Sequence, residues 1–374
     1  MAFLSTPEMR VMAACFRARV PLLFEGSPGV GKSAKITSYL EKWVDYHDVI
    51  IGGIREATDF LGLPVATPEG GVVNYPPMYG INANKAKSAA LLFDELKTAA
   101  PSTQKGMLRV IQEGVLGELV LGSHVYMMAA ANPVEEGADS WDLTPPMANR
   151  FCHVEWKFDV DEWLNGVADN FESTHVYSVE ELIGRPDQMR RSIAAAQVTG
   201  FLYERGSEFL NPPVPTNPAE AGGAWPSPRS WTNAIAVMAE LNPRDEKAIL
   251  LAVKGLVGKK AAAEFIGWRK LASLPNPDEV LADPENAIDW QSRPDVLFAI
   301  VRSVAYIVKS RGTKVAYEAG FKVMEAYERH NRSDVALPSL KQLILSCPSD
   351  ATIPADMLNQ YSKLFEQAGI LKAA

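Results

Sequence analysis

Residues 26–33 read Gly26-Ser27-Pro28-Gly29-Val30-Gly31-Lys32-Ser33. This order matches the pattern G-x-x-x-x-G-K-[ST], in which each residue type has a physical task. Small residues let the backbone curl so that its N–H groups converge on the phosphate oxygens of a nucleotide. The lysine reaches the β- and γ-phosphates as a point charge, and the Ser33 hydroxyl can ligate Mg²⁺. The stretch therefore predicts binding of a nucleoside triphosphate.

The residues on either side place this loop between a strand and a helix. Residues 21–25 form a short apolar run typical of a buried strand, and residues 34–43 have the pattern of a helix. A helix N-terminus carries free amides and the positive end of the helix dipole, and both favour an anion. The context therefore supports a phosphate site over a chance glycine-rich turn.

Strands and helices alternate through residues 1–160. A first helix is expected from Pro7, capped by Thr6, to about Arg17. Five segments then have strand patterns: 21–25, 48–53, 89–94, 125–131 and 152–156. Several are continuous apolar runs, as expected for strands covered on both faces, so we expect an α/β fold with three layers around a parallel sheet. Residues 116–121 and 124–128, joined around Gly122-Ser123, also resemble a hairpin.

The rest of the chain is predicted to be helical. Helical patterns cover residues 192–210, 230–241, 244–257 and 259–271, with a loop at 211–228. A proline-containing linker at 274–277 and 283–284 precedes amphipathic segments at 296–309, 314–329, 339–347 and 355–368. We expect three parts, namely a nucleotide-binding domain at 1–160, an all-α lid at 161–273 and a helical C-terminal region at 274–374.

Polar residues follow two of the predicted strands. Ala90-Leu91-Leu92-Phe93 leads into Asp94 and Glu95, and an apolar strand at 125–131 leads into Asn132. Asp94 is the candidate for holding Mg²⁺, and Glu95 for polarising the attacking water. Asn132 is a candidate to hydrogen-bond that water and the γ-phosphate. Solvated strand ends, and a turn residue before Pro133, are the alternatives.

Two arginines complete the candidate set. Arg150 follows a short helix pattern and is predicted to point out of its own subunit, toward the γ-phosphate of a neighbour. Arg229 lies in the first turn of a helix capped by Ser227 or Ser230, where the helix dipole disfavours a cation. That local cost suggests a phosphate ligand. A dipole-stabilising surface arginine and a solvated arginine are the respective alternatives.

Composition limits the class of protein. The 374 residues carry a net charge of −8 and the pI is near 5.3, which argues against a general nucleic-acid coat. Cys15, Cys152 and Cys347 are far apart and odd in number, which suits a reducing compartment. The first residues lack the pattern of a signal peptide, and no apolar run is long enough to span a bilayer. We expect a cytoplasmic protein.

In its motifs the sequence resembles the AAA+ ATPases, and among them the MoxR family. The resemblance rests on five elements in order: residues 26–33 as Walker A, 91–95 as Walker B, Asn132 as sensor 1, Arg150 as arginine finger and Arg229 as sensor 2. Residues 55–62 and 70–77 resemble the second-strand segment and insertion of that family. The resemblance covers residues 5–270, and Ser33 replaces the more frequent Thr without loss of the hydroxyl.

The resemblance implies an ATPase with Mg²⁺ that assembles as a ring, commonly a hexamer, with active sites shared between subunits. Glu95, Asn132 and Arg150 would be catalytic, and Ser33 and Asp94 would hold the metal. The nucleotide would be bound by Gly26, Ser27, Pro28, Gly29, Val30, Gly31, Lys32, Ser33, Ala34 and Arg229. MoxR-like members remodel proteins, often with a partner that carries a von Willebrand factor A domain. Residues 70–86 and 117–124 would then face the pore or client, with Tyr79 exposed beside Gly80 or packed on the base of the insertion.

Two other functions remain open from the sequence. A nucleic-acid motor or loader would need basic residues in these segments, and Lys85 and Lys87 are the only nearby cations. A phosphotransferase would use the same loop, but Asp94, Glu95 and Asn132 suit a water nucleophile better than an acceptor hydroxyl. Residues 274–374 match no known element and would serve as a client-binding module, a ring-edge contact or an extension of the lid.

Overall fold

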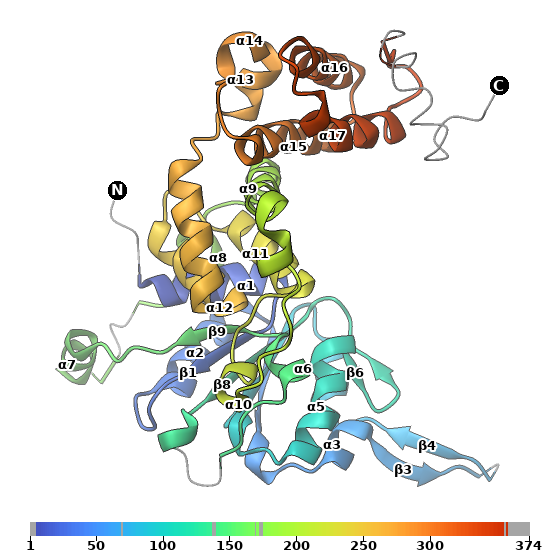
Figure 1. The fold of residues 1–374 in the computed structure, drawn as a ribbon. Coiled ribbons are helices and arrows are strands. Elements are labelled where there is room, and N and C mark those ends of the chain that lie inside the picture. Colours follow the sequence, from blue (N-terminus) through green and yellow to red (C-terminus); the bar gives the residue numbers. More distant parts are fainter. Residues whose placement is uncertain are drawn as a thin grey trace. The chain divides into compact units, whose positions relative to one another are not determined.

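A computed structural model describes residues 5–68, 70–136, 140–168, 170–171, 175–354 and 357. The chain divides into two compact units (Figure 1). The first unit comprises residues 1–186 and 211–263, and the second comprises residues 187–210 and 264–374. Residues 187–210 thus belong with the C-terminal helices. The functional division at 160 and 273 remains a prediction.

A five-stranded parallel sheet forms the centre of the first unit. Its order is β2 (Tyr46–Ile51), β5 (Ala89–Asp94), β8 (Val125–Ala131), β1 (Leu22–Glu25) and β9 (Cys152–Glu155). The predicted α/β fold with a parallel sheet is confirmed. All five strands lie within two residues of their predicted bounds, because continuous apolar runs are a strong signal when both faces are covered.

Alternate residues of these strands face the two helical layers. On one face, Leu91, Phe93 and Met127 belong to a core that also contains Met107 and Val110 of α5 (Pro101–Glu113). On the other face, α1 (Pro7–Ala18) contacts β1 and β9, and the ring of Tyr126 in β8 packs edge-on against Phe16 at 5.1 Å. The period of two along each strand therefore buries both faces.

Two small antiparallel hairpins extend from this core. β3 (Leu63–Ala66) pairs with β4 (Val72–Tyr75), and β6 (Val115–Leu116) pairs with β7 (Leu119–Val120). The predicted hairpin of 116–121 with 124–128 is therefore wrong. The turn lies at Gly117, whose φ of 60° suits glycine, and residues 125–131 enter the parallel sheet because their apolar side chains are buried on both faces.

Tyr79 is buried rather than exposed. It lies in α4 (Met78–Lys85), and its side chain is 8% accessible to solvent. Burial raises its pKa strongly, and the phenol oxygen has no hydrogen-bond partner. The expectation of an exposed Tyr79 is therefore wrong, since the ring belongs to the core on the α5 side of the sheet.

Short helices fill the remaining connections of the first unit. They are η1 (Gly52–Ile54), α3 (Ala57–Leu61), η2 (Leu96–Thr98), η3 (Val134–Glu136), α6 (Pro145–Ala148), α7 (Val160–Ala168), α8 (Val179–Ile183) and α10 (Pro218–Ala221). The helix α2 (Lys32–Trp43) follows the glycine-rich loop, and α11 (Pro228–Glu240) packs against α1. A buried ion pair between Arg10 of α1 and Asp245 fastens α1 to the start of α12 (Glu246–Leu271).

The second unit is helical, as predicted. α9 (Gln188–Phe209) packs against α15 (Pro294–Arg311), which also contacts α16 (Lys314–Arg329) and α17 (Ser333–Leu345). Pro277 and Pro284, expected in a linker, instead begin α13 (Pro277–Ala282) and α14 (Pro284–Ala287), because a proline fits the first turn of a helix. α17 begins before its predicted start and contains Pro338. The predicted helix at 355–368 falls almost wholly outside the described residues.

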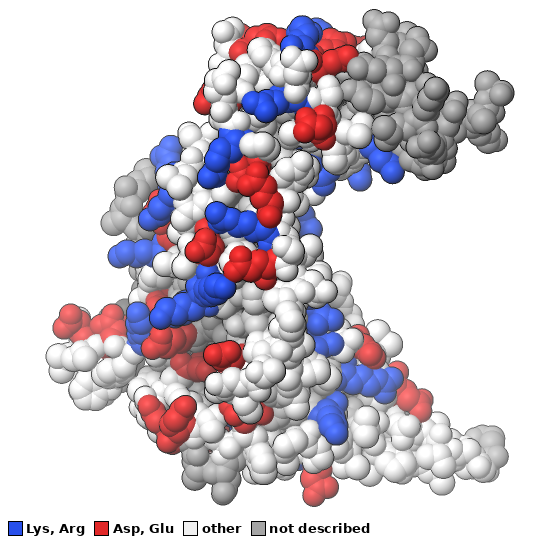
Figure 2. All heavy atoms as spheres, viewed as in Figure 1, with Lys and Arg blue, Asp and Glu red and all other residues white. Residues whose placement is uncertain are grey.

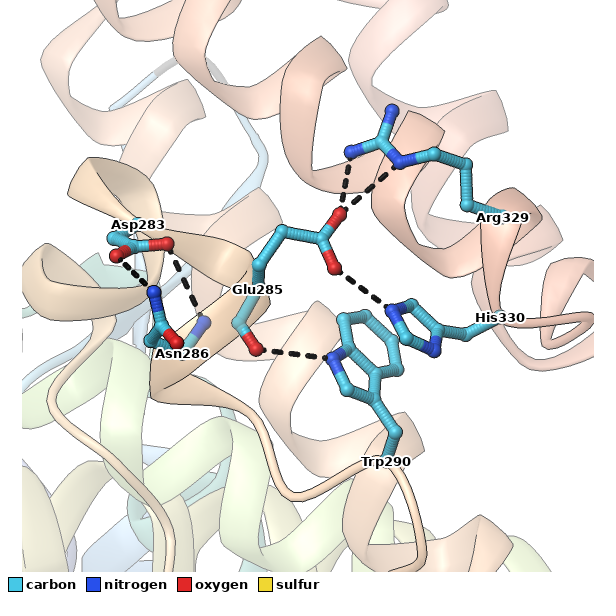
Figure 3. Close-up of polar contacts among 6 residues, drawn as sticks. All are labelled: Asp283, Glu285, Asn286, Trp290, Arg329 and His330. Carbon is cyan, nitrogen blue, oxygen red and sulfur yellow. Dashed lines mark hydrogen bonds and ion pairs between the residues drawn. The ribbon is translucent and has the colours of Figure 1, made fainter.

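A polar cluster joins α14 to the end of α16 (Figure 3). The Glu285 carboxylate accepts hydrogen bonds from Arg329 Nη2 at 2.7 Å and lies 2.8 Å from His330 Nε2. The His330 ring stacks on Trp290 with centroids 4.1 Å apart. The contacts with His330 and Arg329 lower the pKa of Glu285, so this exposed carboxylate is held in its charged form.

None of the described helices combines the length and apolar character needed to cross a bilayer.

Gly258 generates a stability prediction. It kinks α12 with φ 81° and ψ 167°, at the position where the sequence predicted a break between two helices. An added Cβ would lie 2.6 Å from the Ala224 carbonyl oxygen. Gly258→Ala should therefore destabilise the protein by about 1–3 kcal/mol, since only glycine adopts this conformation readily. Denaturant and thermal unfolding measure the change.

Gly267 supplies the matched control in the same helix. It is exposed, and an added Cβ would meet no atom within 4 Å. Gly267→Ala should stabilise by about 0.5–1 kcal/mol through helix propensity. Equal effects of the two substitutions would contradict the assignment of Gly258 as a required break.

Candidate active site

The glycine-rich loop lies where the sequence predicted, between β1 and α2. Gly29 and Gly31 both have φ of 77°, a conformation that residues with a Cβ rarely adopt. Gly26 is packed tightly, since an added Cβ would lie 2.9 Å from Cβ of Trp156. Ser27, Pro28, Gly29, Gly31 and Ala34 are exposed, and Val30 and Ser33 are half-buried. The loop therefore presents its curled backbone to solvent at the N-terminus of α2.

Lys32 is buried and fully engaged within the loop. Its Nζ donates to the carbonyl oxygens of Gly26 at 2.7 Å and Ser27 at 2.8 Å. The third hydrogen bond goes to Asn132 Oδ1 at 2.9 Å. Burial lowers the pKa of Lys32, whereas the negative charges of Asp94 and Glu136 act to raise it. The ammonium group thus bonds to Asn132 at the end of β8 and interacts with the charge of Asp94 at the end of β5.

The strand order explains this convergence. β8 lies between β1 and β5, so Asn132, which follows β8, lies between the glycine-rich loop and the acids that end β5. Carboxyl ends of parallel strands share one edge of a sheet, which is where α/β folds bind ligands. The structure therefore brings Lys32, Asp94 and Asn132 together, as the sequence suggested.

Glu95 has an uncommon backbone conformation. Its φ of 52° and ψ of 39° lie in the left-handed region, which costs of order 1 kcal/mol for a residue with a Cβ. Its amide donates to the Asp94 carboxylate at 2.9 Å, and its side chain is exposed. Such strain is concentrated at functional sites. This backbone conformation leaves the Glu95 side chain exposed to solvent, next to Asp94 in the chain.

Ser33 and Asp94 are the residues that fit a magnesium ion. A hydroxyl and a carboxylate supply hard oxygen ligands, and Mg²⁺ completes its octahedron with phosphate oxygens and water. Among the described residues, no group of three or more His, Cys, Asp and Glu side chains forms a ready-made metal cluster. These residues therefore suit a metal ion that arrives with a nucleotide.

Arg150 is buried in its own chain, unlike the outward orientation expected from the sequence. Its side chain is 8% exposed, and its guanidinium donates to the Pro146 carbonyl and to Gln112 Oε1. The Nε atom is buried without a hydrogen-bond partner. Burial, followed by the nearby charge of Arg229, lowers the pKa of Arg150. Its role toward a neighbouring subunit remains a prediction.

Arg229 lies close enough to Arg150 for their charges to interact. It is exposed in the first turn of α11, where Ser227 is the cap and accepts from the Ser230 amide at 3.1 Å. The Ser227 hydroxyl also donates to Asn149 Oδ1 at 2.8 Å in a buried contact. The start of α11 is therefore fastened to the segment that carries Arg150. A contact of Arg229 with a nucleotide at Lys32 remains a prediction.

Sequence reasoning missed three ionisable residues beside the loop, Glu25, Lys97 and His153. Glu25 ends β1, and its Oε1 lies 3.0 Å from Lys97 Nζ and 3.7 Å from His153 Nδ1. Burial alone would raise the pKa of Glu25, but its contacts with His153 and Lys97 outweigh it and lower the pKa from 4.5 to about 2. The one available signal was an acid placed directly before Gly26.

Two clefts beside α2 were also not predicted from the sequence. Their volumes are about 310 and 340 Å³, and both are lined by Thr6, Lys35, Asp159 and Glu162. Lys35 lies three residues after Lys32 and forms an ion pair with Glu162 of α7. The clefts are thus small openings of mixed polar and apolar lining next to the loop, of a size that suits part of a small ligand.

Comparisons with known proteins add little. None of the known protein-family profiles matches this chain. No curated protein matches its sequence. Among solved structures, the chain is similar to a crystal structure from Cytophaga hutchinsonii whose name is "putative ATPase", with 18% sequence identity and a TM-score of 0.42. The match covers 67% of this chain and 80% of that chain.

The ion cluster at Glu25 predicts a pH dependence of stability. A pKa lowered in the folded state stabilises the fold above about pH 4.5, and this contribution is lost as the pH falls through about 2. Wild type should therefore exceed Glu25→Gln in unfolding free energy by about 1–3 kcal/mol near neutral pH. The difference should shrink between about pH 4.5 and 2. Denaturant unfolding at stepped pH measures it.

Glu240→Gln is the control. Like Glu25, Glu240 is a half-buried carboxylate that pairs with a basic side chain, here Arg17 at 3.5 Å. This variant should lower the unfolding free energy near neutral pH by less than Glu25→Gln does. A difference between wild type and Glu25→Gln that stays constant from neutral to acid pH would contradict the assignment.

Proposed function

We propose that this chain hydrolyses ATP with Mg²⁺ at a site shared between subunits of a ring, and uses the energy to remodel a partner protein in the cytoplasm. The observation that carries the proposal is the contact of Lys32 with Asn132, in reach of the charge of Asp94. It unites a phosphate-binding loop, a metal ligand and a water-orienting amide at one edge of the sheet.

Each of these residues has a role in the proposed reaction. Lys32 would exchange its loop carbonyls for β- and γ-phosphate oxygens, while the loop amides bind the rest of the phosphate chain. Ser33 and Asp94 would hold Mg²⁺, whose charge neutralises the phosphate oxygens. Glu95 would accept the proton of the attacking water, and Asn132 would orient that water. The exposed, left-handed Glu95 is free to reach it.

The two arginines support a shared site. Phosphoryl transfer is stabilised by a guanidinium at the γ-phosphate, and this group is often supplied by a neighbouring molecule. Arg150 and Arg229 interact with each other, and neither forms a hydrogen bond with the loop among the described contacts. Two like charges held together are costly unless an anion neutralises them. The charge of Glu113 offsets this cost at Arg150 in part, and a triphosphate of the next subunit would be a further anion.

Two apolar surfaces of the first unit support protein partners. In the segment of the β3–β4 hairpin, residues 61–78, the sequence has one charged residue, Glu69, and no Lys or Arg; the described residues of the segment are all uncharged (Figure 2). Leu63, Val72, Tyr75 and Met78 are largely exposed on it. On α7, Val160, Trp163, Leu164 and Val167 follow helical spacing and are all exposed. Exposed apolar patches of this kind mark protein contacts.

The resemblance to MoxR proteins gives the proposal its finer detail. It suggests a hexamer, a chaperone-like role and a partner with a von Willebrand factor A domain. The hairpin β3–β4 corresponds to the insertion expected to face the client, and β6–β7 lies beside it, since Gly117 packs against Gly62 and Asn74. A client-facing hairpin that has no Lys or Arg fits a protein better than a phosphate backbone.

ATP hydrolysis tests the core of the proposal. Glu95→Gln should lower kcat by more than about 100-fold while nucleotide binding is retained, because only the proton acceptor is lost. Lys32→Ala should abolish binding. Phosphate release and binding of a fluorescent ATP analogue measure the two effects. Glu135→Gln, an exposed acid in η3, is the control and should keep activity near wild type. An inactive wild type would refute an ATPase.

DNA binding tests the alternative of a nucleic-acid motor. We expect no binding of single- or double-stranded DNA that weakens steeply with salt, since the client-facing hairpin offers no cation to phosphates. Fluorescence anisotropy with labelled oligonucleotides, from about 50 to 200 mM salt, measures this. A steep salt dependence that Lys85→Ala and Lys87→Ala remove would instead favour the motor.

A further inference from the structure

The carboxylate of Glu25 lies at the junction of three segments of the candidate site. Glu25 is the last residue of β1 and directly precedes Gly26 of the glycine-rich loop. Its Oε1 lies 3.0 Å from Lys97 Nζ and 3.7 Å from His153 Nδ1. The Lys97 and His153 side chains are about 10% exposed and that of Glu25 is 27% exposed, so water screens these contacts only in part.

Lys97 brings the turn of Glu95 to this carboxylate. It follows Glu95 by two residues in η2, and its carbonyl oxygen accepts from the Trp141 amide at 2.7 Å. Strands β1 and β5 are not neighbours in the sheet, because β8 separates them. The ion pair between Glu25 and Lys97 therefore spans the end of β8 and fixes the spacing between the loop and the turn.

His153 brings the segment of Arg150 to the same carboxylate. Its Nε2 lies 2.9 Å from the Ala148 carbonyl oxygen. A carbonyl only accepts hydrogen bonds, so Nε2 carries a proton. Nδ1 faces Glu25 at 3.7 Å and attracts its carboxylate only when it carries a proton as well. Ala148 ends α6, two residues before Arg150. The imidazole is thus fixed to the segment that presents the candidate arginine finger and lies against the Glu25 carboxylate.

We propose that Glu25 is a positioning residue that holds the phosphate loop, the Glu95 turn and the Arg150 segment in register through Lys97 and His153. This inference rests on the proposed ATPase function. In this proposal Glu25 contacts neither the nucleotide nor the attacking water, and it acts through Lys97 and His153. A shift of the Glu95 turn by about 1 Å relative to the loop is enough to slow the chemistry strongly. Binding of the nucleotide depends on the loop alone and is little changed.

The test separates kcat from KM in steady-state ATP hydrolysis. Glu25→Gln keeps the shape of the side chain and removes its charge, and should lower kcat by about 10-fold or more with KM within about 3-fold of wild type. Lys97→Met should behave alike. The double variant should be no worse than Glu25→Gln alone, because Glu25→Gln already breaks the contact with Lys97. Lys97→Arg should recover most of kcat.

Glu240→Gln is the matched control, since it neutralises a half-buried carboxylate paired with Arg17 away from the site. It should leave kcat within about 2-fold of wild type. Should Glu25→Gln fold poorly, Lys97→Met alone carries the test, with unfolding measured alongside. Equal kcat for Glu25→Gln and Glu240→Gln, or a loss confined to KM, would overturn the positioning role. An inactive wild type would instead refute the ATPase itself.

Discussion

The position of β8 between β1 and β5 is the constraint on which the candidate site depends. A lysine on the loop after β1 reaches about 6 Å from its backbone, and the acids after β5 lie two strands away, about 10 Å. Asn132 fills the gap, and its amide oxygen accepts the Lys32 ammonium at 2.9 Å. If β1 and β5 were adjacent, the lysine and the acids would pair directly and leave no room for phosphate. The strand order therefore separates the charges that a nucleotide and its metal would bridge.

A second constraint links the site to the helices that follow the sheet. The buried hydrogen bond from Ser227 to Asn149 fixes the start of α11 to the segment after α6. Arg150 and Arg229, distant in sequence, consequently lie within reach of each other's charge. The two positive charges repel each other, so the arginines do not hold each other in place. The neutral contact between Ser227 and Asn149 brings them close. Their position is thus a property of the packing of Asn149 and Ser227.

The sequence predicted the parts of the site that depend on local pattern. The glycine-rich loop, the five strands and the break at Gly258 all carry strong local signals, since glycine and continuous apolar runs restrict the backbone directly. The β3–β4 hairpin was missed because its residues are exposed on both sides, so no burial pattern marks them. Tyr79 was placed wrongly because its burial depends on α5 and the sheet.

The contacts of Glu25, Lys97 and His153 could not be predicted for a related reason. They join Glu25 to residues 72 and 128 positions further along the chain, and only the fold decides that the three meet. The burial of Arg150 is likewise tertiary, since Gln112 and Pro146 come from two different helices. Sequence patterns identify candidate residue types at strand ends. They do not identify which charges are neutralised by which partners.

The assignment of α9 to the second unit has a consequence for how the gene could change. The chain passes from one unit to the other after residues 186, 210 and 263. No single cut in the chain therefore separates the two units. A recombination breakpoint between residues 210 and 263 would place α9 and α15 on different fragments. Either fragment would expose an apolar helix face to water. Exchange of the second unit for another module would need two simultaneous breakpoints, so the two units are expected to be inherited together.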